Sequence, residues 1–200
     1  MASGGINIKS GFKINRNHKL VYLTVPLLEE TNLVNHCFTT RQGGVSSSYF
    51  STLNTSIFKQ DPQENVFTNL DTVCSAVGID YKKLVSTFQT HGDEVYVVEE
   101  SDIGRGIDRV GEAILADALI TNLRHVPLIT YYADCVPIYL VDTENKAIGL
   151  IHSGWRGTIQ KIVEKTLLKM KEVYSTDPAN CVAAIGPSLE KDCFEVDYDV

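Results

Sequence analysis

Apolar residues cluster in short runs separated by polar turns, a pattern that predicts a protein built largely of short strands. Four runs are rich in β-branched residues and apolar throughout, as in strands buried on both faces: residues 116–121, 126–132, 138–141 and 147–151. Further strands are expected at residues 20–25, 33–39, 84–88, 94–98 and 181–185. The runs at 84–88 and 94–98 flank a turn, so we expect them to pair around it.

Two segments switch to helical spacing. Apolar residues recur every three or four positions over residues 66–77, and the Asp61-Pro62 pair before them resembles a helix start with Asp61 as N-cap. Gly78 supplies a stop, and a second amphipathic pattern covers residues 159–173. Strands and helices follow one another without an internal repeat or a low-complexity linker. The sequence therefore predicts one domain over residues 1–200, of the α/β or α+β class with a mixed sheet.

Composition and charge restrict the classes of function. A chain of 200 residues with 44% hydrophobic content can bury a full core. Its net charge of -7 argues against a nonspecific grip on DNA or RNA, although a free nucleoside stays possible. The start Met1-Ala2-Ser3-Gly4-Gly5 lacks an apolar signal region and no run is long enough to span a bilayer, so we expect a cytoplasmic protein. Five scattered cysteines predict reduced thiols rather than a disulfide framework.

Three side chains that bind zinc readily stand where apolar runs end. His91 follows the run at 84–88, Cys135 follows the run at 126–132, and His152 follows the run at 147–151. Two imidazoles and one thiolate leave the fourth position of a tetrahedral zinc ion open, as in catalytic rather than structural sites. The sequence thus predicts an open zinc site, although it does not fix the distance from His91 to the other two residues.

Each of these residues also has a structural interpretation. Cys135 is also consistent with a buried core thiol. For His152 the alternative is a hydrogen-bonded core histidine. Asp134 directly precedes Cys135 in an otherwise apolar stretch. Because a carboxylate is costly to bury without partners, we expect a polar cluster at that position.

Two glycine-rich loops each contain an arginine. Residues 154–157 join a strand to a helix, and such a turn offers N–H groups to an anion, with Arg156 as a further donor. The alternative is that these glycines only permit a tight turn. Residues 40–46 contain Arg41 but match neither nucleotide-binding glycine pattern, so a substrate loop and a solvated turn both stay open.

Eight short motifs occur together in the order found in one protein family: Thr40-Arg41-Gln42-Gly43-Gly44-Val45-Ser46, Leu53-Asn54, Gln89-Thr90-His91-Gly92, Asp117-Ala118-Leu119-Ile120-Thr121, Ala133-Asp134-Cys135-Val136-Pro137, His152-Ser153-Gly154-Trp155-Arg156-Gly157, Ile185-Gly186-Pro187 and Cys193-Phe194-Glu195-Val196. From about Leu33 to Val200 the chain resembles the laccase-domain proteins. These have been called multicopper polyphenol oxidases and are regarded as zinc-dependent purine nucleoside phosphorylases.

The resemblance implies a three-layer α/β/α sandwich with His91, Cys135 and His152 as zinc ligands. It also implies phosphorolysis of adenosine, inosine, guanosine and methylthioadenosine, and hydrolytic deamination of adenosine, with purine nucleosides and phosphate as the partners. Family members usually continue beyond the Cys-Phe-Glu-Val motif with a further strand and helix. We therefore expect this chain to lack its C-terminal strand and helix.

These reactions suggest roles for four more residues. Zinc-assisted deamination needs a carboxylate to move protons, and Asp134 is the first candidate and Asp117 the second, although either could only orient a ligand. Phosphorolysis needs a positioned phosphate and a stabilised purine leaving group. We assign Arg41 and Arg156 to phosphate or purine as hypotheses.

Three rival functions stay open. A copper-dependent phenol oxidase would need His and Cys clusters for several metal ions, which five scattered histidines do not favour. A thiol hydrolase would use Cys135 as nucleophile and His152 as base. A zinc-stabilised domain that binds a partner would carry no activity. The preferred nucleoside and the oligomeric state are not fixed by the sequence.

Overall fold

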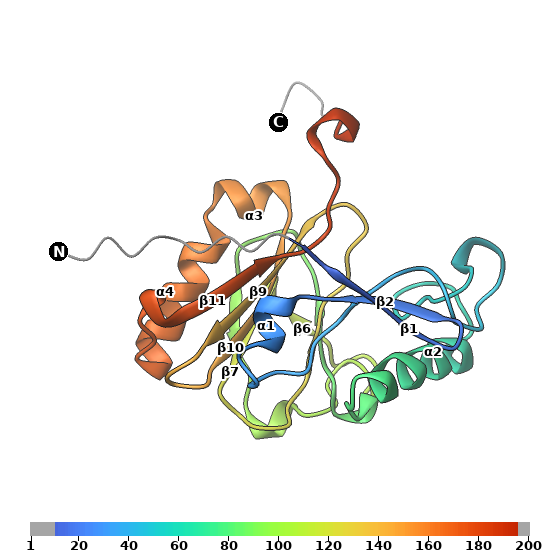
Figure 1. Ribbon diagram of the computed structural model, residues 1–200, viewed down its shortest axis with the longest axis horizontal. Coiled ribbons are helices and arrows are strands. Elements are labelled where there is room, and N and C mark those ends of the chain that lie inside the picture. The colour runs from blue at the N-terminus through green and yellow to red at the C-terminus, as the bar shows by residue number, and fades with distance from the viewer. Residues whose placement is uncertain (1–10, 196–200) are drawn as a thin grey trace.

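A mixed five-stranded sheet forms the centre of the protein in the computed structural model, which describes residues 11–195 (Figure 1). The expectations for the start of the chain and for its last five residues lie outside the described part. The strands of the central sheet lie in the order β11 (Cys181–Ile185), β9 (Val136–Asp142), β10 (Ile148–Ser153), β7 (Ala118–Thr121) and β5 (Val95–Val97). The β5–β7 pair is parallel and the other pairs are antiparallel, so the sheet is mixed as expected.

Two smaller sheets accompany the central one. A parallel sheet contains β6 (Ile114–Leu115), β4 (Val85–Phe88) and β8 (Leu128–Ile129), with β4 in the middle. An antiparallel sheet contains β1 (Lys13–Asn17), β2 (Leu20–Thr24) and β3 (Phe38–Thr39). The α-helices are α1 (Pro26–Glu29), α2 (Gln63–Ala76), α3 (Trp155–Ile159) and α4 (Ile162–Tyr174). Short 3-10 helices cover Ser48–Phe50, Tyr81–Lys83, Glu100–Asp102, Pro178–Asn180 and Lys191–Cys193.

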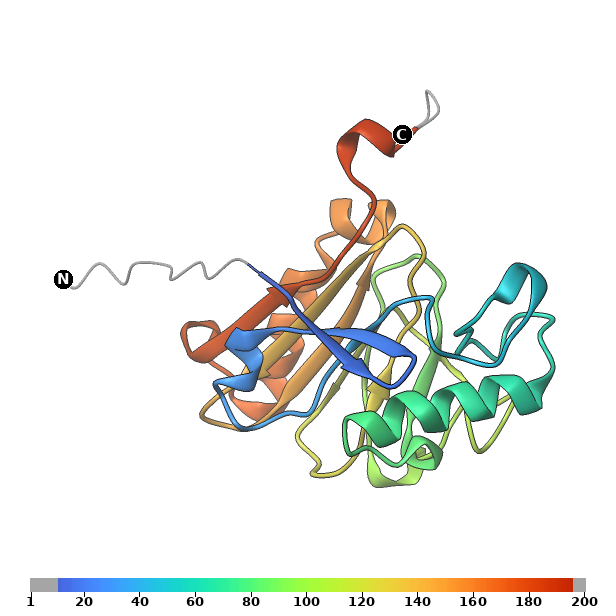
Figure 2. The ribbon, with the colours of Figure 1, turned by 45° about the vertical axis from the view of Figure 1, so that its right-hand side comes forward.

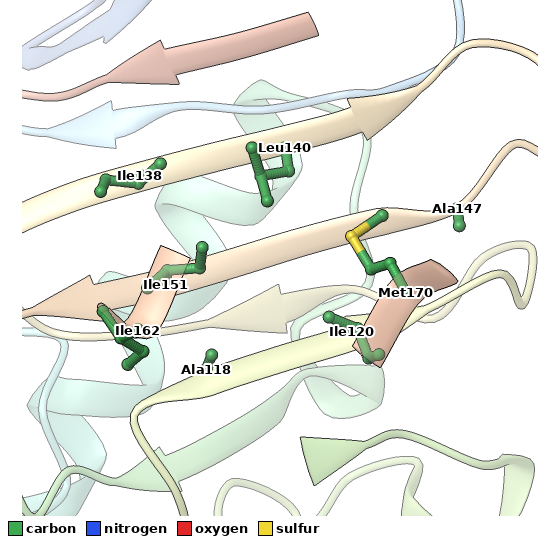
Figure 3. Packing of buried hydrophobic residues seen from close by; sticks show 8 residues of the cluster. All are labelled: Ala118, Ile120, Ile138, Leu140, Ala147, Ile151, Ile162 and Met170. Atoms are coloured by element: carbon green, nitrogen blue, oxygen red, sulfur yellow. The ribbon is translucent and has the colours of Figure 1, made fainter. Parts of the chain in front are cut away.

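Helix α4 covers one face of the central sheet. Its residues Ile162 and Met170 are completely buried against side chains of β7, β9 and β10, including Ile120 and Ile151 (Figure 3). These apolar positions recur at helical spacing along α4, so one face of the helix packs on the sheet while lysines and glutamates face water. Burial of this apolar area stabilises the end of β10, which carries His152.

The opposite face of the central sheet is covered by two different elements. Leu28 of α1 packs with Val141 and Ala184 near the β11 edge. Leu119 of β7 packs with Val85 of the small parallel sheet, behind which α2 lies. Figures 1 and 2 both show α4 and α2 on opposite sides of the strands. The structure thus confirms the mixed α/β class. Within residues 11–195, no helix is both long and apolar enough to cross a bilayer.

The expected pairing of the strands around His91 is wrong. Strand β4 pairs with β6 and β8, whereas β5 pairs with β7, so the two strands belong to different sheets. The turn between them does not close a hairpin because its N–H groups at His91 and Gly92 donate to the carboxylate of Asp117 instead. The His91 turn therefore bridges the central sheet and the small parallel sheet.

Two predicted strands are much shorter in the structure. Only residues 38–39 of the segment 33–39 are extended in a ladder, because His36 Nε2 accepts the N–H of Val25 and holds the chain before β3 in an irregular path. Only residues 128–129 of the segment 126–132 form a strand. Beyond them, the Gln89 side chain pairs with both the N–H and the carbonyl of Tyr131, taking the place of a neighbouring strand.

The two predicted helices begin differently from expectation. Asp61 does not cap α2, because its carboxylate accepts hydrogen bonds from Ser46 and Asn54, and the helix starts without a side-chain cap. The pattern over residues 159–173 predicts one helix, but the structure divides it into α3 and α4. Lys161 between them has a left-handed φ of 62°, which interrupts the helical path.

A buried amide organises the loop at residues 43–54. Asn69 of α2 is completely buried; its Oδ1 accepts the N–H of Val45, and its Nδ2 donates to Ser46 Oγ and to the carbonyl of Asn54, each at 2.8 Å. A Cβ at Gly44 would lie 2.4 Å from Asn69 Oδ1, so only glycine fits beside this amide. The loop is therefore held in place by a buried side chain of α2.

Replacing Asn69 with Ala should lower the free energy of unfolding by about 2 kcal/mol, because the substitution leaves buried loop groups without partners. Urea unfolding of the variant and the wild type measures the difference. Gln63→Ala removes an exposed amide from the same helix and should shift the midpoint far less. Equal midpoints for Asn69→Ala and Gln63→Ala would show that the amide does not hold the loop.

Candidate metal centre

The register of β9 and β10 brings Cys135 and His152 together. His152 lies opposite Pro137 and Ser153 opposite Val136, so the end of β10 lies beside the start of β9. Cys135 immediately precedes β9. Two residues that are 17 positions apart in the sequence therefore meet at one end of the central sheet.

His91 reaches the same place from the turn between β4 and β5. Its backbone has a left-handed φ of 60°, which is uncommon for a residue other than glycine and often marks a functional position. The turn is fixed on its other side by Asp93, which forms an ion pair with Lys165 of α4. His91 is exposed, Cys135 is half-buried and His152 is buried, so the group is open toward solvent on the His91 side.

The three side chains have a suitable geometry for one metal ion. One ligand atom from each residue lies within 4.8 Å of the others. Two ligands of the same zinc ion are separated by at most the sum of their bonds, about 4.4 Å, so small side-chain adjustments suffice. The two imidazole rings are perpendicular, at 89°, with centroids 4.9 Å apart. The structure thus contains a possible metal site formed by two imidazoles and one thiol.

Asp117 connects two of these three residues. This completely buried carboxylate, directly before β7, lies 2.8 Å from His152 Nδ1. It also accepts the N–H groups of His91 and Gly92 and the hydroxyl of Thr90 at 2.8 to 3.0 Å. Burial acts to raise the pKa of Asp117, but the hydrogen bonds from His152, Gly92 and Thr90 outweigh it and lower the pKa to about 2. The carboxylate is therefore ionised at neutral pH.

The same hydrogen bond determines which nitrogen of His152 is available. With Nδ1–H donating to the Asp117 carboxylate, Nε2 is the nitrogen left to bind a metal ion. A carboxylate behind a histidine ligand also fixes the ring orientation and raises its basicity. Asp117 thus supports ligation without being a ligand itself.

The thiol of Cys135 is protonated in the absence of a metal ion. Burial raises its pKa, and the negative charges of Asp134 and Asp117 raise it further. Metal-free, activated cysteines show the opposite shift, toward a lower pKa. A bound cation would replace the proton and relieve this unfavourable negative potential.

Two glycines let the chain approach the three ligands closely. A Cβ at Gly154 would lie 3.4 Å from Cys135 Sγ and 3.4 Å from His91 Cδ2. A Cβ at Gly157 would lie 2.6 Å from the carbonyl oxygen of Gly92, which is too close for any side chain. The glycines of this loop therefore permit contact between α3 and the His91 turn, which a general preference for tight turns does not explain.

A cavity of about 1600 Å³ includes His91, Cys135 and His152 in its wall. Arg41 also lines it, and its guanidinium donates two hydrogen bonds to the carbonyl of Ser51, at 3.1 and 3.3 Å. Arg156 is not among the lining residues within the described part of the chain. Its exposed guanidinium lies over the ring of Trp155, 4.1 Å from the centroid.

A polar cluster was expected at Asp134, and the structure places one next to Cys135, around the carboxylate of Asp117. Asp134 is exposed on the wall of the cavity, because the chain reaches the surface just before β9. The buried carboxylate of the cluster is Asp117, which the sequence analysis named as the second candidate for proton transfer. The proton-transfer roles of both carboxylates stay predictions.

The sequence interpretation gave no role beside the ligands to three further residues, although Gly154 belongs to the glycine-rich loop at residues 154–157. Thr90 donates to Asp117, Gly154 lies against the ligands, and the Tyr132 ring lies 5.7 Å from the His152 ring. Thr90 and Gly154 belong to the motifs around His91 and His152, so proximity to a ligand was the available signal. Tyr132 carries none, because it falls within a segment that was expected to be a buried strand.

The chain is similar in sequence to one family of known proteins. The family model described as "Multi-copper polyphenol oxidoreductase laccase" matches residues 35–200. Purine nucleoside phosphorylase YlmD of Bacillus subtilis is 34% identical over 161 residues, which are 80% of this chain and 58% of that protein. Adenosine deaminase RL5 of an unknown prokaryotic organism is 34% identical over 165 residues, 82% and 63% of the two chains.

The fold is similar to that of a solved structure of comparable sequence identity. The crystal structure of the Bacillus licheniformis hypothetical protein YfiH aligns with a TM-score of 0.84 at 31% identity, covering 93% of this chain and 68% of that chain. The present chain spans about three fifths of the length of the curated relatives.

Replacing Asp117 with Asn should weaken zinc binding by about 10- to 100-fold, because the His152 ring and the His91 turn lose the charge that orients them. Competition with a chromophoric chelator measures the affinity. Asp134→Asn removes an exposed carboxylate from the same site and should change the affinity much less. An Asp117→Asn protein that binds zinc like the wild type would rule out the orienting role.

Replacing Gly157 with Ala should distort the metal site, because the new methyl group must push the Gly92 carbonyl and hence the His91 turn away. The visible absorption spectrum of the cobalt-substituted protein reports the ligand geometry directly. Gly149→Ala in β10 is the matched control, since a Cβ there meets only ordinary contacts at 3.4 Å or more. Identical cobalt spectra for Gly157→Ala and the wild type would contradict this account.

Proposed function

The chain belongs to the family described as multi-copper polyphenol oxidoreductase laccase, and we propose that it is a zinc-dependent purine nucleoside phosphorylase that also deaminates adenosine. The names of its relatives support a nucleoside-processing enzyme. The chain spans only part of the length of these relatives. The proposed activity therefore rests on the residues of this chain in addition to the names of the relatives. We also propose that residues 1–200 form one domain and that the protein is cytoplasmic.

The observation that carries the proposal is the group formed by His91, Cys135 and His152 on the wall of a large cavity. Two imidazoles and one thiolate match the three-ligand pattern of catalytic zinc sites. A zinc ion held by these residues would supply Lewis acidity at the wall of the cavity. Exposure of His91 leaves that side of the group accessible.

The protein residues have separate tasks in this proposal. Asp117 keeps the His152 ring and the His91 turn in place, and both its oxygens already accept hydrogen bonds. Asp134, exposed on the cavity wall, is the better candidate for moving protons during deamination. We therefore keep Asp134 as the first candidate for this step and assign Asp117 to positioning.

Phosphorolysis requires cationic groups that bind phosphate and stabilise the negative charge on the purine leaving group. We assign Arg41 and Arg156 to phosphate or purine. Arg41 has the stronger support, because it lines the cavity and is held by the Ser51 carbonyl. Arg156 lies on Trp155 outside the cavity wall, so its part would require a substrate that extends to α3.

The rival functions have less support. Within residues 11–195, His91, Cys135 and His152 form one group of candidate ligands, which suits one metal ion rather than several coppers. The raised pKa of Cys135 disfavours a free thiolate nucleophile. Two alternatives stay open to experiment. Elemental analysis identifies the bound metal as zinc or copper, and an activity assay separates the enzyme from a non-catalytic partner-binding domain.

The purified protein, with its metal content quantified, should convert adenosine and phosphate to adenine and ribose 1-phosphate, and adenosine and water to inosine and ammonia. Cys135→Ala removes the thiolate ligand and should lose both the zinc and at least about 100-fold of the turnover. Chromatographic separation of adenine, inosine and hypoxanthine, together with elemental analysis of the metal, measures both effects.

Cys181→Ala serves as the matched control, because Cys181 lies in β11 outside the site and should retain zinc and turnover. Full phosphorolysis by Cys135→Ala would sink the zinc mechanism. Zinc-loaded wild-type protein that yields no product would favour the partner-binding domain, and oxidation of phenols by the copper-loaded protein would favour the laccase alternative.

A further inference from the structure

Three aromatic rings from separate segments meet on the wall of the cavity. Phe58 lies after the loop at residues 43–54, Phe88 ends β4, and Tyr131 follows β8. The Phe58 ring is perpendicular to both others, at 85° to Phe88 with 5.4 Å between centroids and at 88° to Tyr131 with 5.8 Å. All three residues line the same cavity as the candidate metal ligands.

The covalent chain keeps this aromatic cluster close to the metal ligands. Phe88 precedes His91 by three residues and Tyr131 precedes Cys135 by four. Segments of that length span at most about 10 and 14 Å, respectively. The Gln89 side chain further limits the separation of the two segments, because it forms hydrogen bonds with both the N–H and the carbonyl of Tyr131.

Both phenylalanines are partly exposed. Phe88 is 50% exposed and Phe58 is 38% exposed, whereas the three residues before Phe88 in β4 are buried. Large apolar side chains left exposed in a concave surface mark binding sites more often than chance would give. In an edge-to-face pair the edge of one ring covers one face of the other, so three of the four ring faces are not used by that contact. The exposed fractions of Phe58 and Phe88 show that part of each ring is accessible to a ligand.

Polar and cationic groups share this wall. Lys59 follows Phe58 directly, and Arg41 lines the cavity as well. A ligand that combines a flat aromatic ring with an anionic partner therefore meets complementary groups in one cavity. A purine base beside a phosphate has this combination of chemistry.

We propose that Phe58 and Phe88 form a stacking surface for the purine base of the substrate. The identity of the base rests on the proposed function, whereas the affinity for a flat heterocycle follows from the rings themselves. Stacking depends on the face of the base and not on its hydrogen-bonding edge. The surface therefore accepts adenine, hypoxanthine and guanine with similar affinities.

The test measures binding of hypoxanthine, which has neither a glycosidic bond to cleave nor an amino group to remove. Its affinity for the purified, metal-quantified chain is measured by isothermal titration calorimetry. Phe88→Ala should weaken hypoxanthine binding by about 10-fold, within the range measured for loss of one base–aromatic stack. Phe88→Tyr preserves the ring and should bind within about twofold of the wild type.

Phe12→Ala is the matched control, because Phe12 is 37% exposed but does not line the cavity within the described residues. It should bind hypoxanthine like the wild type, with the same zinc content. Zinc content is measured for every variant, so loss of the metal is not mistaken for loss of the stack.

Two results would overturn the proposal. One is a wild-type chain that does not bind hypoxanthine at millimolar concentration. The other is a Phe88→Ala protein with unchanged hypoxanthine affinity, above all if its dimer fraction falls in light scattering. Unchanged hypoxanthine affinity together with a lower dimer fraction would assign the surface to a second copy of the chain. Phe88 would then contact that copy together with the neighbouring Leu115, which is 67% exposed. Hypoxanthine binding without turnover of nucleosides supports the stacking surface while rejecting the proposed function.

Discussion

The buried carboxylate of Asp117 is the interaction on which the rest of the site depends. It lies at the start of a central strand and accepts hydrogen bonds from His152 and from the turn that carries His91. A buried charge is tolerable only when such donors surround it. The donors that offset the cost of burying this carboxylate belong to His152 and to the turn that carries His91. One set of hydrogen bonds therefore both stabilises the buried charge and positions two of the candidate metal ligands.

Close packing around this carboxylate explains the glycines of the site. The His91 turn touches α3 at Gly157, and Gly154 lies against the thiol and an imidazole. Helix α4 fixes the other side of the arrangement through its buried face and through the ion pair of Lys165 with Asp93. The three candidate ligands are therefore held by elements of the central sheet and of the small parallel sheet, while the cavity that they line also has aromatic and cationic side chains in its wall.

Several strands and the three ligand candidates could be predicted because their signals are local. Runs of β-branched residues identify β7, β9 and β10, and each ligand stands where such a run meets a polar turn. A polar cluster was expected at Asp134 because it has apolar neighbours in sequence, yet the buried carboxylate of that cluster is Asp117 and Asp134 itself is exposed. Burial is a property of packing, which the neighbouring residues alone do not fix.

The sequence by itself determined the mixed α/β class, the amphipathic helices and the residue types suited to a metal ion, because hydrophobic periodicity and side-chain chemistry are local properties. Only the tertiary structure decided that β4 and β5 belong to different sheets, that Gln89 replaces a strand partner at Tyr131, and that Phe58 meets Phe88. These outcomes depend on where buried donors and acceptors find partners across distant segments. Side chains satisfy that requirement as well as strands do, so the spacing of apolar residues does not reveal which of them is used.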